Sequence, residues 1–266
     1  MGNAELLDIA RDVALAAGRL VHQRRAEGVE VAASKSSPED IVTHADRESE
    51  ALIRSLLAEA RPADGFFGEE SGADAGTSGL TWIVDPIDGT VNFLYGIPFY
   101  AVSIAVVEGD PDPATWHALA AAVVNPAIGE VFTATDAGGA FLGDQPIRVA
   151  ENTDLSQALV GTGFSYSAEQ RLTQAAIVAQ LIGEVRDVRR IGTASLDLCS
   201  VASGRLNAYY ERGLKPWDHA AGALVAREAG AAVRGLRGAP GTGEFLLAAH
   251  PVVADKLEAA LVEFGM

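Results

Sequence analysis

Residues 81–93, TWIVDPIDGTVNF, begin as an apolar run and then place two aspartates three residues apart beside a proline, a glycine and a threonine. The apolar run predicts a strand with Asp85 just after its end, because Pro86 cannot continue a sheet ladder. Gly89 permits a close turn into GTVNFLYG, which we expect to form a short helix closed by Gly96. Two carboxylates beside a buried strand are costly unless something compensates their charge.

The paired aspartates have two interpretations. Asp85 and Asp88 can face one point and bind a cation, while the first free NH groups of the short helix, at Gly89 and Thr90, form a neighbouring anion site. Alternatively, Asp88 only caps that helix. Residues 81–93 alone do not decide between the two.

Other carboxylates also stand at the ends of predicted elements. Glu69 and Glu70 follow an apolar Phe-Phe pair where a strand ends. Asp46 lies on the inward stripe of a predicted helix, and Asp218 starts another helix behind an aromatic residue, Trp217. Each has an ordinary explanation alone: a favourable charge in a helix's first turn, an N-cap, or a solvated loop. Together they would repel one another unless hard cations draw them in.

The composition is that of an ordinary globular chain. Hydrophobic residues make up 48% and charged residues 21% of the 266 residues, which favours a large core over extended disorder. No run of about twenty apolar residues occurs and the first residues are acidic, so we expect no membrane span, no signal peptide and a cytoplasmic location. The net charge of -16 predicts no nucleic-acid partner. The single cysteine, Cys199, excludes an intramolecular disulfide.

Hydrophobic spacing predicts two unlike halves. Apolar residues at helical spacing predict amphipathic helices over residues 5–25 and 43–60. Short β-type runs joined by turns between residues 81 and 143 predict an antiparallel meander covered by helices. From about residue 150, strand-like and helix-like runs alternate, which is typical of an α/β layer. No repeat or linker separates the halves, so we expect one compact body.

Four blocks of this sequence closely resemble motifs of the inositol monophosphatase family of metal-dependent phosphatases. The blocks that carry the resemblance are GEES (68–71), WIVDPIDGTVNF (82–93), GTAS (192–195) and WDHAAGALVAREAGA (217–231). Asp46 in THAD and Glu211 in YYERG fall in the family's order and spacing. The similarity extends from the first predicted helix to beyond Gly230, and a chance match of all these blocks in order is very improbable.

The resemblance implies a layered αβαβα sandwich of the α+β / α/β class. An N-terminal antiparallel sheet lobe over residues 1–148 would carry most metal ligands, and a C-terminal α/β lobe over residues 149–266 would complete one catalytic unit. Two or three Mg²⁺ ions per active site are implied. Their implied ligands are Glu69, Asp85, the backbone carbonyl of Ile87, Asp88 and Asp218. Lys35 matches a lysine near the family's metal-bound water network, where it would modulate metal or lithium affinity.

The resemblance also implies which residues react and which contact substrate. Thr90 would help to activate the attacking water with Asp46 as its hydrogen-bond partner, and Glu69 belongs to the same catalytic set. A threonine hydroxyl needs a carboxylate acceptor because it is too weak an acid to act as a base alone, whereas a metal-bound water is already closer to hydroxide. The implied substrate contacts are Asp88, Gly89, Thr90, Gly192, Thr193, Ala194, Glu211 and Asp218.

Substrate selection is expected in the second half of the chain. The small residues 192–195 would let the backbone approach a ligand, although an ordinary β-to-α turn with its threonine as cap is the alternative. Glu211 matches a family carboxylate that accepts a hydrogen bond from a polyol hydroxyl, which indicates a hydroxyl-rich or amine-bearing substrate. Lys215 and Pro216 depart from the residues expected in the animal inositol enzymes and leave the exact ester open.

The expected function is Mg²⁺-dependent hydrolysis of myo-inositol 1-phosphate to inositol and phosphate. The alternatives on the same fold are a histidinol-phosphate phosphatase, a 3'-nucleotidase and a fructose-1,6-bisphosphatase. A non-enzymatic alternative is a regulatory partner of the transcription machinery. The resemblance further implies a small phosphorylated polyol or amino alcohol as ligand, sensitivity to lithium and a homodimer.

Overall fold

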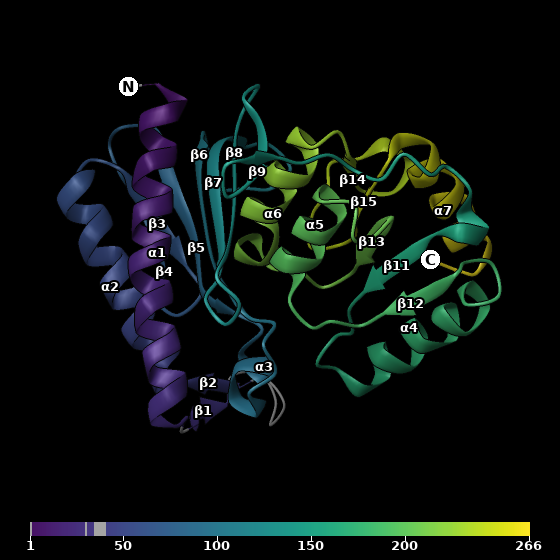
Figure 1. The fold of residues 1–266 in the computed structure, drawn as a ribbon, viewed down its shortest axis with the longest axis horizontal. Coiled ribbons are helices and arrows are strands. Elements are labelled where there is room, and N and C mark those ends of the chain that lie inside the picture. The colour runs from purple at the N-terminus through teal and green to yellow at the C-terminus, as the bar shows by residue number, and fades with distance from the viewer. Residues whose placement is uncertain (1, 30, 35–40) are drawn as a thin grey trace.

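The computed structural model describes residues 2–29, 31–34 and 41–266, which form five stacked layers (Figure 1). Paired helices make the first, third and fifth layers, and a sheet lies between each two of them. The helical layers are α1 (Asn3–Glu27) with α2 (His44–Ala60), α5 (Ala194–Ala202) with α6 (Pro216–Glu228), and α4 (Ala168–Leu181) with α7 (Pro251–Glu263). This order confirms the predicted αβαβα sandwich.

Within the described residues, the first sheet has eight strands in the order β10-β9-β8-β7-β6-β5-β3-β4. The strands are β3 (Gly65–Gly68), β4 (Gly72–Asp74), β5 (Leu80–Asp88), β6 (Ala101–Glu108), β7 (His117–Asn125), β8 (Glu130–Thr135), β9 (Gly139–Leu142) and β10 (Gln145–Pro146). The predicted antiparallel meander holds from β5 to β10. Strand β3 precedes the predicted meander and runs parallel to β5, because the chain first forms the edge strand β4 and then returns to the inner side of β3.

The second sheet, counted over the same described ranges, has five strands in the order β12-β11-β13-β15-β14. They are β11 (Leu159–Thr162), β12 (Asp187–Arg189), β13 (Ala208–Glu211), β14 (Ala232–Arg234) and β15 (Leu246–Ala249). Strand β11 is parallel to β12 and β13, and the remaining pairs are antiparallel. The shorter elements are β1 (Val31–Ser34), β2 (Ile41–Thr43), α3 (Thr90–Tyr95), and the 3₁₀ turns η1 (Leu155–Gln157) and η2 (Leu236–Gly238).

The chain changes from the first sheet to the second between β10 and β11, where the sequence places the boundary between residues 148 and 149. Helices α5 and α6 belong to the second part of the chain, yet they pack on both sheets. The division into lobes of residues 1–148 and 149–266 therefore stays a proposal about two parts of one body.

Apolar cores fill the spaces between the layers. Between the first sheet and the outer helices, α1 contributes the predicted inward stripe, with Leu6, Val13 and Val21 buried. The core between the first sheet and helices α5 and α6 is rich in alanine, which allows a close approach. A further core lies under α4 and α7. Each large apolar side chain buried in these cores contributes about 1.5–3 kcal/mol.

Strand β5 continues past the point where the sequence predicts its end. It runs through Pro86 to Asp88. Asp85 lies opposite Ser103 of β6, and the next paired residue, Asp88, lies opposite Ala101. Because β5 advances three residues where β6 advances two, the strand contains a β-bulge. Residues three apart in a regular strand point to opposite faces, so the bulge brings both aspartates to the face that carries α5 and α6.

Helix α6 packs against α5 through Gly222. A Cβ there would lie 2.8 Å from the Leu198 Cβ and 2.9 Å from the Ser195 carbonyl oxygen. We expect Gly222→Ala to lower the free energy of unfolding by about 1–3 kcal/mol because of this overlap, although alanine alone favours a helix by about 1 kcal/mol. Urea titration measures the change. Gly183→Ala is the control, since its added methyl would meet only an ordinary contact; an unchanged Gly222→Ala midpoint would contradict the close packing.

Candidate active site

Elements that are distant in the sequence meet at the bulge of β5. Hydrogen bonds join β5 to the start of α5, and α3 to the start of α2. Helix α6 packs on β5. Burial raises the pKa of Asp85, and the charges of Glu69, Asp88 and Asp218 raise it further. The fold therefore brings the carboxylates predicted from separate motifs into one region.

Asp88 is held from the start of α5. Its Oδ2 accepts hydrogen bonds from the Thr193 hydroxyl at 2.5 Å, the Ser195 hydroxyl at 2.5 Å and the Ser195 backbone NH at 2.8 Å. Burial raises the pKa of Asp88, while these donors and the Ala194 NH lower it. The interpretation of Asp88 as a helix cap is wrong, because the N-cap of α3 is Gly89 in the left-handed conformation.

The predicted pair of Thr90 and Asp46 is present in the structure. The Thr90 hydroxyl lies 3.2 Å from Asp46 Oδ1 and 3.1 Å from the Ile87 carbonyl oxygen, and its single proton can be donated to one of them at a time. Asp46 Oδ2 also accepts hydrogen bonds from the backbone NH and the hydroxyl of Thr43. Burial raises the pKa of Asp46 to about 6, and the Thr43 donors oppose that rise. Thr90 is thus oriented by a carboxylate that is itself fixed.

The other predicted metal ligands affect one another's pKa. Asp85 Oδ1 accepts a hydrogen bond from the Ile87 backbone NH at 3.0 Å. Asp218 Oδ2 accepts a hydrogen bond at 2.6 Å from the backbone NH of Lys215, the N-cap residue of α6. Burial raises the pKa of Asp85 well above its usual value, and the charges of Glu69 and of neighbouring aspartates raise it further. Burial and mutual repulsion therefore both disfavour the ionised form of these groups.

The chemistry of this donor set suits a hard divalent cation. Carboxylates and the Ile87 carbonyl are oxygen ligands, the type that Mg²⁺ and Ca²⁺ prefer. The hydrogen bonds above use Oδ2 of Asp218 and Oδ1 of Asp85, so in the described part of the chain the second oxygen of each is left for a cation. In the described part of the chain, no group of three or more Asp, Glu, His or Cys side chains is already arranged to hold a metal ion. The ligand atoms are of the type that a hard cation needs. The carboxylate side chains would have to move closer together to complete its coordination.

Gly89 and Gly192 meet where α3 approaches the segment before α5. Both have positive φ, 88° and 96°. A Cβ on Gly89 would lie 3.1 Å from the Phe99 carbonyl oxygen and 3.2 Å from that of Gly192, so a side chain would push these segments apart. Thr193 is the N-cap of α5, as the turn-and-cap interpretation predicts. The Thr193 hydroxyl also donates a hydrogen bond to Asp88 of β5, so the capping and site interpretations of Thr193 are compatible.

Glu211 ends β13, in the second sheet. Its Oε2 accepts a hydrogen bond from the Tyr209 hydroxyl at 2.5 Å. Burial raises the pKa of Glu211 to about 7, Tyr209 and Arg190 lower it, and the Asp88 charge raises it. Glu211 therefore lies within electrostatic reach of Asp88, and its contact with substrate stays a prediction.

Other polar residues at the site were outside the predicted set. Glu50 lies one turn after Asp46 on the buried face of α2 and accepts a hydrogen bond from the Glu70 NH at 2.8 Å. Asn92 donates to two backbone carbonyls and so ties α3 to the segment before α5. Glu50 could have been predicted from the sequence, because residues four apart in a helix lie on the same face and Glu50 follows Asp46 by four. Asn92 and Ser195 lie in the motifs WIVDPIDGTVNF and GTAS. Their hydrogen-bond partners are 99 and 107 residues away in the sequence, so no local pattern indicates these bonds.

One residue named from the family resemblance has no described position. Lys35 lies outside the described residues. His219 is buried and packs on Trp116, with ring centroids 5.9 Å apart, and burial lowers its pKa to about 4. None of the described helices is long and apolar enough to cross a membrane.

Comparison with known proteins gives one consistent match over nearly the whole chain. The model of the inositol monophosphatase family matches residues 3–263. The inositol-1-monophosphatase of Mycobacterium leprae is 46% identical over 282 aligned residues, covering 98% of this chain and 94% of the relative. Nus factor SuhB of Escherichia coli K12 is 39% identical over 236 residues, covering 88% and 86%. The crystal structure of extragenic suppressor protein suhB from Bartonella henselae is 36% identical, with a TM-score of 0.88 and coverage of 98% and 100%.

The layered fold and these matches define a phosphatase of the αβαβα class. More specifically, the chain belongs to the inositol monophosphatase family. The resemblance drawn from the motifs, the fold class and the assignment to a phosphatase are therefore confirmed. Members of this family are in general metal-dependent, and the family indicates a phosphorylated small-molecule substrate.

Asp197 lies on the buried face of α5. It is 1% exposed, and its Oδ1 has no hydrogen-bond partner within the ranges that the structure describes. Burial raises the pKa of Asp197 well above its usual value, and the charges of Glu211 and Asp88 raise it further. The folded state keeps a proton that the unfolded chain releases near pH 4. Stability therefore falls as the pH rises above that value.

We expect Asp197→Asn, which keeps the shape and has no proton to lose, to raise the melting temperature at about pH 7–8 and to change it little near pH 4. Each kcal/mol gained corresponds to roughly 2–4 °C for a chain of this size. Thermal unfolding at both pH values measures the effect. The control is Asp187→Asn, since Arg189 lowers the pKa of that half-exposed aspartate. A melting temperature at or below wild type at both pH values would contradict the assignment.

Proposed function

We propose that the protein is a Mg²⁺-dependent phosphomonoesterase that hydrolyses inositol monophosphate, with myo-inositol 1-phosphate as the leading substrate. The observation that carries this proposal is the bulge of β5, which turns Asp85 and Asp88 to one face beside the pair formed by Thr90 and Asp46. Membership of the inositol monophosphatase family supports the reaction class.

The metal would be held by the acidic groups around the bulge. The proposed ligands are Glu69, Asp85, the carbonyl of Ile87, Asp88 and Asp218, for two or three Mg²⁺ ions. When bound, Mg²⁺ would lower the pKa of a water molecule and neutralise charge on the phosphoryl oxygens. The Thr193 and Ser195 donors stabilise the carboxylate form of Asp88 and so oppose the rise in its pKa that burial causes.

Thr90 is the proposed proton-handling residue. By donating its proton to Asp46 Oδ1, the Thr90 hydroxyl would leave an oxygen lone pair to accept a proton from the attacking water. The backbone NH groups of Gly89 and Thr90, at the start of α3, would donate to the phosphoryl oxygens as charge develops. Glu69 completes the proposed catalytic set.

Glu211 is the proposed selector of the alcohol part of the ester. It approaches the acidic site from the second sheet, and the backbone of Gly192, Thr193 and Ala194 would line the same side of the substrate. A carboxylate accepts hydrogen bonds from hydroxyl or ammonium groups. The proposed ligand class is therefore a small phosphorylated polyol or amino alcohol, and histidinol phosphate, a 3'-nucleotide and fructose 1,6-bisphosphate are the competing esters.

The test of substrate and metal is phosphate release from inositol 1-phosphate, histidinol phosphate, 3'-phosphoadenosine 5'-phosphate and fructose 1,6-bisphosphate, each with Mg²⁺ and with EDTA. We expect preference for inositol 1-phosphate and loss of release in EDTA. Asp88→Asn should reduce kcat by at least about a hundredfold, because it removes a metal-ligand charge. Preference for another ester would replace the proposed substrate, and equal release in EDTA would refute the metal site.

Thr90→Ala tests the proton-handling role separately. Loss of general acid–base assistance lowers kcat by about 10²–10⁴, and we expect KM to change much less. Steady-state kinetics on the preferred ester measures both constants. Thr173→Ala, on the exposed side of α4, is the matched control. A change confined to KM would show that Thr90 only binds substrate.

A regulatory role is the second candidate. The name Nus factor SuhB, carried by the relative from Escherichia coli, is the observation that favours it. Full activity on one ester would not oppose this role, whereas no metal-dependent release from any ester would favour it over catalysis. The homodimer, lithium sensitivity, cytoplasmic location and absence of a nucleic-acid partner stay predictions.

A further inference from the structure

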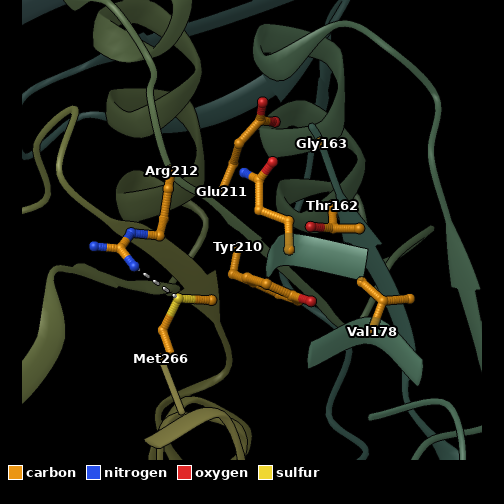
Figure 2. Close-up of a pocket in the computed structure, with 8 residues that line it drawn as sticks. Thr162, Gly163, Val178, Tyr210, Glu211, Arg212 and Met266 are labelled. Carbon is orange, nitrogen blue, oxygen red and sulfur yellow. Dashed lines mark hydrogen bonds between the residues drawn. The ribbon is translucent and has the colours of Figure 1, made fainter. Parts of the chain in front are cut away.

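The Glu211 carboxylate occupies space that only a glycine leaves open. Strands β11 and β13 are parallel neighbours, with Thr162 beside Tyr210, and Gly163 directly follows β11. A Cβ on Gly163 would overlap both carboxylate oxygens and the carboxyl carbon of Glu211. Figure 2 shows Glu211 beside Gly163, while Tyr210 extends the other way from β13. The missing side chain at position 163 therefore determines where the carboxylate can lie.

One oxygen of Glu211 is also fixed by a hydrogen bond. The Tyr209 hydroxyl donates to Oε2 at 2.5 Å, and the Tyr209 ring is completely buried. A buried phenol has little freedom to follow a moving carboxylate, so this bond sets the direction of the group. Among the described residues, Oε1 of Glu211 has no protein donor and is left to accept a hydrogen bond from a ligand.

The small cavity next to Glu211 does not hold the substrate. It has a volume of about 10 Å³ and lies between β11, α4, β13 and the C-terminal residue, as Figure 2 shows. That volume suits at most one water molecule. The cavity is too small for an ester, and the Asp88 charge acts on Glu211. On the proposed function, the ester meets Glu211 from the side of the acidic site.

We propose that Gly163 and Tyr209 are positioning residues for specificity: they aim Oε1 of Glu211 at one hydroxyl or ammonium group of the substrate. This inference rests on the proposed function, in which Glu211 contacts the alcohol part of the ester. Within the described ranges, the Tyr209 hydroxyl bonds to Glu211, and the atoms nearest to a Cβ on Gly163 would be those of Glu211, so neither residue is joined to a proposed metal ligand. A change at either one should therefore alter which ester is preferred and leave phosphate chemistry intact.

The test compares inositol 1-phosphate with phenyl phosphate, whose alcohol part carries no hydroxyl or ammonium group. Gly163 is not among the glycines with positive φ, so alanine suits its backbone, and the new methyl would displace the flexible end of Glu211. We expect Gly163→Ala and Tyr209→Phe to lower kcat/KM for inositol 1-phosphate about tenfold or more, the effect of losing a hydrogen bond to a charged group. Phenyl phosphate should change less than about twofold.

Two controls separate positioning from general damage. Gly183→Ala adds the same methyl at a surface turn and should leave both esters unchanged. In a Glu211→Gln background, Gly163→Ala should cause no further loss, because both changes act through one carboxylate. Equal losses on the two esters, no loss on either, or additive losses with Glu211→Gln would each overturn the inference.

Crystal structures of the wild type and Gly163→Ala test the positioning without any turnover. Displacement of the Glu211 carboxylate is expected, and a carboxylate still in place would overturn the inference. If the wild type prefers another ester from the panel, the proposed substrate fails, but a changed ranking in Gly163→Ala still supports positioning. If the wild type hydrolyses no ester, the proposed function fails, and the specificity role of Gly163 and Tyr209 fails with it even if Glu211 moves.

Discussion

The β-bulge in β5 is the constraint on which the candidate site depends. A regular strand would turn Asp85 and Asp88 to opposite faces of the sheet. The extra residue puts both on the face that carries α5 and α6. Pro86, which has no NH to pair, lies within this irregular part and so loses no ladder hydrogen bond. The following turn at Gly89 then starts α3 beside the same two carboxylates.

Burial of several carboxylates is possible because helix starts supply donors to them. Asp46 and Asp218 occupy the same position in two helices, the third residue, and each accepts the backbone NH of its own N-cap residue. At the start of α5, the hydroxyl of the N-cap residue Thr193 and the backbone NH of Ser195 donate to Asp88. Since a carboxylate has two oxygens, one can stabilise a helix end while the other faces the site. Capping and site chemistry are therefore not competing explanations for these residues.

The sequence allows the elements and the acidic residues to be predicted, but not their register. The amphipathic stripe of α1 and the alternation after residue 150 follow from local spacing, and the carboxylate set follows from the motifs. The bulge was missed because proline normally ends a strand, and it becomes visible only through the pairing of β5 with β6. The partnership of Asp88 with Ser195 joins residues 107 positions apart, so no local pattern indicates it.

The site draws its two proposed tasks from different sheets, and this has a consequence for specificity. The groups assigned to phosphate and metal come from β5, α3 and the starts of the helices. Glu211 comes from β13, and its carboxylate lies against Gly163, the residue after β11. A neighbour of Glu211 can therefore change without moving any hydrogen bond to Asp85 or Asp88. On the proposed role of Glu211, substrate preference would shift through a single residue such as Gly163, while the carboxylates that bear the repulsive charge stay constrained by one another.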